Sequence, residues 1–307
     1  MLDMNYQAIL DHIYTDIQPQ IGVGKVASYI PELAKVSPAH FGMAIVDLHG
    51  NVYAVGDANT VFSIQSISKL FALTLAFHSQ GDAIWQRVGR EPSGNPFNSL
   101  VQLEREAGKP RNPFIIAGAL VVTDMLCTRF THAENALLQF IRKISHNPDI
   151  SFDEAVAKSE RNTSDRNSAM AHFMKSFGNL HNPVEVVLDA YCKHCAIRMN
   201  ATDLARAVTF LANGGALPWN GDAVLDKSSA KRLSALMLTC GTYDAAGDFA
   251  FRVGLPAKSG VGGGIVAVMP GECGICVWSP ALEETGNSHA GSLALEMLTN
   301  LTGRSIF

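Results

Sequence analysis

Ser66-Ile-Ser-Lys69 places a hydroxyl and an amine three residues apart, directly before a run of apolar residues. If residues 62–77 form a helix, Ser66 and Lys69 lie on one face about one turn apart. A serine becomes nucleophilic when a neighbour removes its proton, and a lysine can do so when burial lowers its pKa. The dipole of that helix would favour an alkoxide at Ser66. The stretch predicts a serine nucleophile, although the same spacing also occurs by chance.

A second stretch, Lys258-Ser-Gly-Val-Gly-Gly-Gly264, precedes the strand-like residues 265–269. A Lys-Ser-Gly triplet that opens a strand resembles the Lys-Thr-Gly triplet that accompanies Ser-x-x-Lys in penicillin-binding proteins and class A β-lactamases. There the strand faces the nucleophile and supplies a cation for the substrate carboxylate and a backbone N–H for the oxyanion. A phosphate-binding loop is excluded, because its lysine follows the glycines and leads into a helix. A plain glycine-rich turn stays open as an alternative.

Several motifs, spread over nearly the whole chain, carry a closer resemblance. They are Ser63-Ile-Gln-Ser-Ile-Ser-Lys69, Pro96-Phe-Asn-Ser99, Arg111-Asn-Pro-Phe114, Ala117-Gly-Ala119 and Arg252-Val-Gly-Leu-Pro-Ala-Lys-Ser-Gly-Val-Gly-Gly-Gly264. Together they resemble the glutaminase family, and the last motif is highly specific. The resemblance implies hydrolysis of the side-chain amide of L-glutamine to glutamate and ammonia through an acyl-enzyme on Ser66, with no cofactor.

The resemblance also implies roles for individual residues. Lys69 is the partner of Ser66 and Tyr243 is a second proton-transfer candidate; which of them first accepts the proton is open. Backbone N–H groups of Ser66 and Val261 would form an oxyanion hole. The residues matched to the substrate's amino and carboxylate groups are Tyr29, Glu160, Asn167 and Tyr191, with Glu160 opposite the ammonium. Lys258, Ser259 and Gly260 complete the site. From the sequence alone, without the resemblance, we would interpret Glu160 as an ordinary solvated glutamate and Asn167 as a helix cap.

Position 116 departs from the family pattern, which has Asn where Phe114-Ile-Ile-Ala-Gly118 has Ile116. The family's Asn contacts the substrate, whereas isoleucine neither donates nor accepts a hydrogen bond. A polar ligand group left without its partner typically costs about 1–3 kcal/mol. We therefore expect Ile116 to weaken glutamine binding rather than to create a new reaction.

Composition agrees with an enzyme that has a large core, since 47% of the 307 residues are hydrophobic and the formal net charge is −4. No cluster of Lys and Arg indicates nucleic-acid binding. The first residues lack the charged and apolar regions of a signal peptide, and no run approaches the ~20 apolar residues that span a bilayer. The sequence therefore predicts a cytoplasmic protein without membrane contacts. The family resemblance adds a homo-oligomer, either a dimer or a tetramer.

Six cysteines include two pairs, Cys192-Lys-His-Cys195 and Cys273-Gly-Ile-Cys276, with the spacing of a four-thiolate zinc site. The first pair lies in an amphipathic helical pattern and the second in a strand pattern, whereas such zinc ligands usually lie on tight turns. We interpret all six as reduced core thiols and expect no metal.

The order of the elements predicts an α+β fold. A helix is expected over residues 6–17, a hairpin from strands 41–47 and 51–55, strands at 249–253, 265–269 and 274–278, and a last helix through 301 capped by Asn287. Residues 66–239 are almost wholly helical, with breaks at Pro and Gly positions. We expect a mostly antiparallel sheet flanked by helices (residues 1–65 and 240–307) with an inserted helical lobe (66–239), the β-lactamase/transpeptidase-like layout of glutaminases, in one catalytic domain.

Two alternatives to a glutaminase are open. Another Ser-x-x-Lys serine hydrolase, β-lactamase-like or esterase-like, is disfavoured by the missing secretion signal and by the lack of a clear Ser-x-Asn partner motif. A binding protein whose pocket Ile116 has disabled is disfavoured by the intact Ser66 and Lys69.

Overall fold

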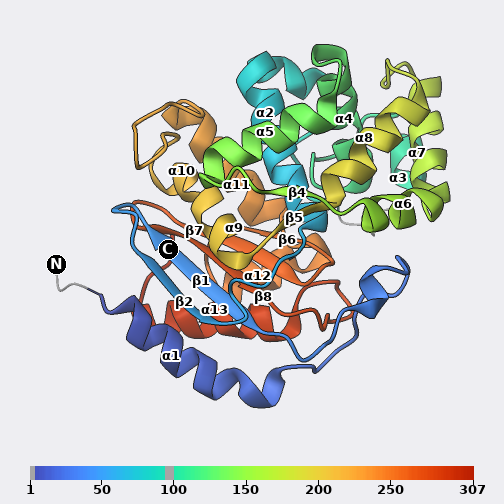
Figure 1. Cartoon of the computed structure of the whole chain (residues 1–307). Helices are drawn as coiled ribbons and strands as arrows, with labels where there is room; N and C mark the ends of the chain where they lie inside the picture. The colour runs from blue at the N-terminus through green and yellow to red at the C-terminus, as the bar shows by residue number, and fades with distance from the viewer. Residues whose placement is uncertain (1–3, 94–99) are drawn as a thin grey trace.

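A computed structural model describes residues 4–93 and 100–307 of the chain. The motif Pro96-Phe-Asn-Ser99 therefore lies outside the described residues. Within those residues, no helix is both long and apolar enough to cross a membrane. Figure 1 shows a sheet with two helices below it and a larger group of helices above it.

The central sheet has five strands in the order β2-β1-β8-β7-β6, and every neighbouring pair is antiparallel. Its strands are β1 (Gly42–Asp47), β2 (Val52–Gly56), β6 (Ala257–Ser259), β7 (Gly264–Met269) and β8 (Cys273–Trp278). The expected hairpin, the antiparallel character of the sheet and the two strands near the C-terminus are confirmed. Strand β8, from the C-terminal part, pairs with β1 from the N-terminal part, which joins the two ends of the chain in one sheet.

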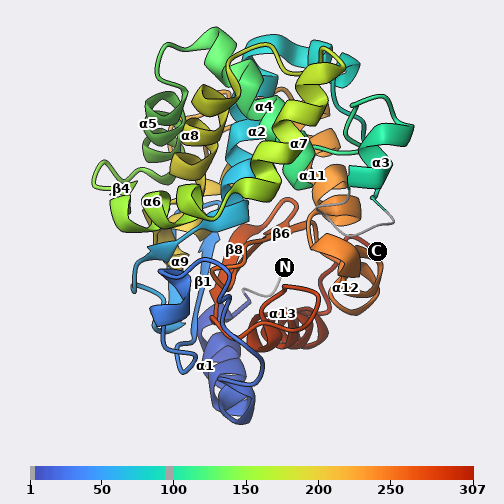
Figure 2. The same ribbon diagram turned by 90° about the vertical axis from the view of Figure 1, so that its right-hand side faces the viewer.

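Both faces of this sheet are covered, which explains why β1, β7 and β8 are buried along their whole length. Side chains alternate along a strand, so Met43 and Ile45 pack with the terminal helices while Ala44 and Val46 pack with the helical group. The terminal helices α1 (Tyr6–Ile17) and α13 (His289–Thr302) lie side by side under one face. Figure 2 shows the sheet from another side, with α1 and α13 below it and the helical group above it.

The helical group carries a small second sheet, ordered β3-β5-β4. Its strands are β3 (Phe62–Ser63), β4 (Ser151–Phe152) and β5 (Ile197–Met199), and its helices are α2 (Ser68–Gln80), α3 (Leu100–Arg105), α4 (Ile116–Arg129), α5 (Ala133–Ser145), α6 (Glu154–Asn162), α7 (Asp165–Ser176), α8 (Val184–Cys195), α9 (Ala201–Ala207), α10 (Thr209–Ala212) and α11 (Lys227–Cys240). Helix α9 lies directly on β1 and β8. The expected long helical region is confirmed, but the sequence analysis missed these short strands, which offer too few residues for a period-two pattern.

Three expectations about single elements are wrong. The segment expected as a strand at 249–253 is helical through residue 252, in α12 (Ala246–Arg252), which buries Phe249 on one side and leaves Phe251 in solvent. Ser66 lies in a 3₁₀ turn, η3 (Gln65–Ile67), that precedes α2, rather than in the first turn of a helix over residues 62–77. The last helix is capped by Ser288, whose hydroxyl accepts from the Gly291 N–H, and not by Asn287.

The six cysteines are free thiols, and all except the half-buried Cys127 are buried. Cys192 and Cys195 lie in α8, and Cys273 and Cys276 in β8, as the sequence patterns predict.

Candidate active site

The turn that carries Ser66 is held by side-chain contacts on both sides. Gln65, directly before it, has a positive φ of 49°, which a residue with a side chain rarely adopts. Its amide nitrogen donates to Ser63 Oγ at 3.0 Å, and that hydroxyl donates to the Cys195 carbonyl at 2.8 Å. Ser66 itself is only 9% exposed. The C-terminus of α8 therefore fixes the backbone from which Ser66 projects.

The glycine-rich turn after β6 lies against the same segment. A Cβ at Gly260 would come within 2.5 Å of the Ile64 carbonyl oxygen, and one at Gly262 within 2.4 Å of the Ser63 carbonyl oxygen. Only glycine permits this approach. The structure thus brings the Lys-Ser-Gly stretch beside Ser66, as the sequence predicts, although the triplet ends strand β6 instead of opening one.

Lys69 is buried one turn beyond Ser66, at the start of α2. Its ammonium donates to the Phe114 carbonyl at 3.3 Å and lies 5.9 Å from the centre of the Tyr191 ring. Burial lowers the pKa of Lys69 to about 8, since it disfavours the charged form, and electrostatic interactions with Cys195 and Glu160 oppose that shift only in part. Lys69 can therefore hold or release a proton near neutral pH.

Tyr243 faces Ser66 from the loop after α11. It begins the turn η5 (Tyr243–Ala245) with a φ of 57°, and its hydroxyl donates to the Ser259 carbonyl at 3.3 Å. Burial raises the pKa of Tyr243, while hydrogen bonds with the Ser66 side chain and the Val261 backbone lower it in part. The phenol is thus protonated at neutral pH and lies within hydrogen-bonding range of the candidate nucleophile.

Lys258 lies behind Tyr243 and is fully buried. Its ammonium donates to the carbonyls of Gly241 at 3.0 Å and Ser259 at 2.6 Å, and lies 4.8 Å from the centre of the Tyr243 ring. Burial, followed by the charge of Lys69, holds the pKa of Lys258 well below its usual value. With protein carbonyls as acceptors, Lys258 supports the loop and does not present a cation to a substrate carboxylate.

Glu160 is 7% exposed although its sequence neighbours are polar. Burial raises its pKa to about 7, while Cys195, Lys69 and Gln65 lower it in part. Its Oε2 atom is buried and has no hydrogen-bond partner among the residues that the structure describes. A buried carboxylate oxygen in this state is an open acceptor, because buried polar atoms are normally paired.

The remaining predicted residues lie at different depths. Tyr191 is buried on α8, and Val261 packs in one apolar cluster with residues of α6 and with Tyr243. Ile116 begins α4 and is half-buried, whereas Asn167 on α7 is half-buried and Tyr29 is 60% exposed. The site therefore has a buried centre and a more exposed set of candidate binding residues.

Two residues of this centre were missed by the sequence analysis, namely Gln65 and Cys195. Gln65 adjoins Ser66 and lies within hydrogen-bonding range of Glu160, and Cys195 is close to Glu160, Lys69 and Tyr191. Adjacency to the nucleophile was the only signal for Gln65, and nothing in the sequence distinguishes Cys195 from the other buried cysteines. In residues 4–93 and 100–307, no group of three or more His, Cys, Asp or Glu side chains is placed to hold a metal ion.

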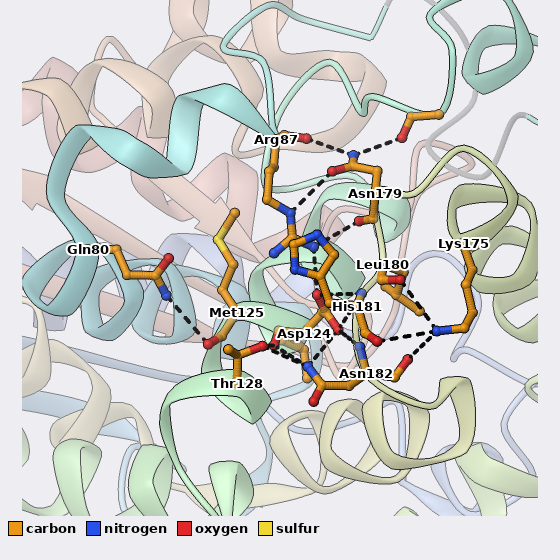
Figure 3. Close-up of polar contacts among 12 residues, drawn as sticks. Gln80, Arg87, Asp124, Met125, Thr128, Lys175, Asn179, Leu180, His181 and Asn182 are labelled. Atoms are coloured by element: carbon orange, nitrogen blue, oxygen red, sulfur yellow. Dashed lines mark hydrogen bonds and ion pairs between the residues drawn. The ribbon is translucent and has the colours of Figure 1, made fainter.

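A buried ionic network fixes the far side of α4 (Figure 3). Asp124 is fully buried and accepts from Arg87 at 2.6 Å, from the Asn182 backbone N–H at 2.8 Å and from the His181 backbone N–H at 3.1 Å. Burial alone would raise the pKa of Asp124, but these hydrogen bonds outweigh it and lower the pKa. The network joins α4, which begins at Ile116, to the loop before α8.

The glutaminase family model matches residues 24–307. The chain belongs to the glutaminase family. It is 69% identical to a glutaminase of Ralstonia nicotianae over 304 residues, covering 99% of this chain and all of that one, and 65% identical to a glutaminase of Paraburkholderia phytofirmans, again over 304 residues and with the same coverage. As a member of this family the chain is an amidohydrolase with glutaminase activity.

Solved glutaminase structures share the fold. A probable glutaminase from Bacillus subtilis aligns with a TM-score of 0.90 at 34% identity and covers 99% of this chain and 98% of its own. A structure of a probable glutaminase from Bacillus subtilis complexed with 6-diazo-5-oxo-L-norleucine aligns with a TM-score of 0.88, also at 34% identity, covering 100% and 99% of the two chains. The β-lactamase-like fold that the sequence predicts is thereby confirmed.

Proposed function

We propose that the chain hydrolyses the side-chain amide of L-glutamine through an acyl-enzyme on Ser66. The observation that carries the proposal is the buried Ser66 with the Tyr243 hydroxyl in hydrogen-bonding range and, one turn further along the chain, a buried lysine whose pKa is about 8. Ser66 Oγ attacks the amide carbon and loses its proton; the C–N bond then breaks, and the leaving nitrogen takes up a proton to depart as ammonia. Water cleaves the resulting ester, which releases glutamate and restores the Ser66 hydroxyl.

Lys69 is suited to the proton transfer because a useful fraction of it is neutral. With a pKa of about 8, roughly one-tenth of the amines are neutral at pH 7, compared with about 0.03% for an ordinary lysine. General bases work best when their pKa is close to the operating pH. Tyr243 is the second candidate, and as a protonated phenol it can donate to the leaving nitrogen.

Backbone N–H groups of Ser66 and Val261 form the proposed oxyanion hole. The Val261 backbone N–H lies within hydrogen-bonding range of Tyr243. A carbonyl oxygen that becomes negative would take over this donor, and one such donor typically contributes about 3 kcal/mol to the transition state.

Glu160 is the proposed partner of the substrate ammonium, since its buried Oε2 lacks a partner among the described residues. The relative from Bacillus subtilis supports an amino-acid ligand, because 6-diazo-5-oxo-L-norleucine is an α-amino acid with a carbonyl at side-chain carbon 5, where glutamine has its amide. Tyr29, Asn167 and Tyr191 are proposed to hold the remaining polar groups of the substrate.

Ile116 is proposed to weaken this binding. It begins α4 without a side-chain cap, so its position offers no polar side chain to a ligand. Ile116→Asn should lower KM for glutamine by about tenfold, which corresponds to one hydrogen bond of about 1.4 kcal/mol. An unchanged KM would contradict this role.

The test of the proposed function is glutamate release from L-glutamine, measured over a wide concentration range, with Ser66→Ala as the control. Loss of activity in Ser66→Ala supports the serine mechanism, and retained activity refutes it.

We also propose that the protein forms a homo-oligomer, a dimer or tetramer, which light scattering after gel filtration would test. The two lobes, residues 1–65 with 240–307 and residues 66–239, are proposed to act as one catalytic domain.

A further inference from the structure

Asn287 lies in the loop before α13 and is only 2% exposed. Its amide nitrogen donates to the Thr242 carbonyl at 3.0 Å and to Thr285 Oγ1 at 3.2 Å. Its amide oxygen accepts from Ser259 Oγ at 2.5 Å. Asn287 thus connects the residue before Tyr243 with the end of strand β6, two segments that are distant from each other in the sequence.

Both bonded segments determine where the Tyr243 hydroxyl lies. The Thr242 carbonyl directly precedes the left-handed backbone of Tyr243, a conformation that a large side chain adopts only when its surroundings enforce it. Ser259 carries the carbonyl that accepts from the Tyr243 hydroxyl. Asn287 therefore holds the backbone of Tyr243 at one end and the acceptor of its phenol at the other.

Close packing constrains the start of this loop at Gly241. A Cβ at Gly241 would lie 1.8 Å from the Ala257 carbonyl oxygen, and one at Gly286 would lie 3.6 Å from the Tyr243 ring. The Lys258 amine adds two hydrogen bonds, to the carbonyl oxygens of Gly241 and Ser259. Among these contacts, Asn287 is the one that connects the Tyr243 loop to the segment before α13.

We propose that Asn287 is a positioning residue for Tyr243, fixing its hydroxyl on Ser66 for proton transfer without itself contacting the substrate. The proposal rests on the proposed function, in which Tyr243 exchanges a proton during amide hydrolysis. A misplacement of about 1 Å can cost about a hundredfold in rate, so removal of the clamp should reduce kcat more than KM.

A double-mutant cycle tests this role. Asn287→Ala should lower kcat for glutamine hydrolysis about 10- to 100-fold and change KM less than about threefold. In a Tyr243→Phe background, where the hydroxyl is absent, the same substitution should change kcat by less than about twofold. Thr285→Ala is the matched control, since it removes the Asn287 contact that does not touch the Tyr243 loop, and it should leave kcat within about twofold of the wild type.

If Asn287→Ala does not fold, Ser259→Ala replaces it, because it removes the hydrogen bond to the Asn287 amide oxygen while Asn287 keeps its donor bond to the Thr242 carbonyl. Equal loss of kcat in both backgrounds would show a merely structural role and overturn the proposal. If kcat is unchanged in the Asn287 variant but low in Tyr243→Phe, the positioning role of Asn287 is refuted, while the proton transfer by Tyr243 stands. An unchanged kcat in Tyr243→Phe would refute the proton transfer itself, and positioning with it.

Discussion

Lys69 should destabilise the fold at neutral pH, and its replacement by methionine should therefore stabilise the protein while abolishing activity. The ammonium is buried, and its pKa falls from 10.5 to about 8 because burial disfavours the charge. Because the pKa of Lys69 is lower in the folded state than in the unfolded state, folding at pH 7 includes the cost of burying a protonated, charged amine. The gap between the two pKa values corresponds to about 3 kcal/mol.

The sign and the pH window follow from the same two values. Below pH 8 the amine is protonated in both states, so the whole penalty is present. Between pH 8 and 10.5 the folded state loses its proton first, and the penalty declines to about 1.5 kcal/mol at pH 9.5. Lys69→Met should thus gain about 2 kcal/mol less at pH 9.5 than at pH 7. Loss of the Lys69 charge also raises the pKa of Glu160 above its value of about 7, so Glu160 becomes neutral in the variant at pH 7.

Urea unfolding at pH 6, 7, 8.5 and 9.5 measures this difference, with Ser66→Ala as an inactive reference. Lys231→Met is the matched control, since Lys231 is exposed and its replacement should change the free energy of unfolding by less than about 0.5 kcal/mol. A Lys69→Met protein that is less stable than the reference at pH 7, or whose gain is equal at pH 7 and 9.5, would refute the reasoning.

Three further predictions concern the pH profile and the support of the site. The kcat for glutamine should rise with pH toward a plateau above pH 8, because only neutral Lys69 accepts a proton; a profile that is flat from pH 6 to 9 would contradict this. KM should rise about tenfold between pH 8 and 6 as Glu160 is protonated with its pKa of about 7, and Glu160→Gln should remove that dependence. Asp124→Ala should lower the free energy of unfolding by about 3–5 kcal/mol in urea titrations, because it leaves Arg87 without its buried carboxylate; a loss below about 1 kcal/mol would show that the network contributes little.

The sequence predicts the fold well where a pattern spans several residues. Strand β1 contains a continuous apolar run because both faces of the sheet are covered, and its hairpin turn is marked by Gly50. Helix α12 was misread because Phe249-Ala-Phe-Arg-Val253 alternates like a strand, and only its tertiary position shows that Phe251 remains in solvent. A segment this short fits both the two-residue period of a strand and the 3.6-residue period of a helix.

The site was predictable where the chemistry lies in local motifs, as in Ser66 with Lys69 and in the glycines at 260 and 262, which pack against the nucleophile segment. The burial of Glu160 could not be predicted, because the residues next to it in the sequence are polar. Its burial arises from the packing of α6 on α8. The left-handed Gln65 was equally hidden, since its conformation is enforced by Ser63 and by the end of α8.

Unfavourable conformations and charges concentrate around Ser66. Four residues other than glycine have a positive φ in the described part of the chain, namely Gln65, Ala107, His146 and Tyr243. His146 simply ends α5, where left-handed residues are common, and Ala107 follows the end of α3. Gln65 and Tyr243 instead begin 3₁₀ turns close to Ser66, the proposed nucleophile, and each is held by a side-chain hydrogen-bond network.

The buried Lys69 and the half-paired Glu160 add to the cost of this arrangement. A substrate ammonium would supply the missing partner to Glu160, and a substrate carbonyl oxygen would replace Tyr243 at the Val261 N–H. The same groups that lower the free energy of unfolding would then favour substrate binding. For this reason, substitutions that stabilise the free protein at this centre should reduce its activity.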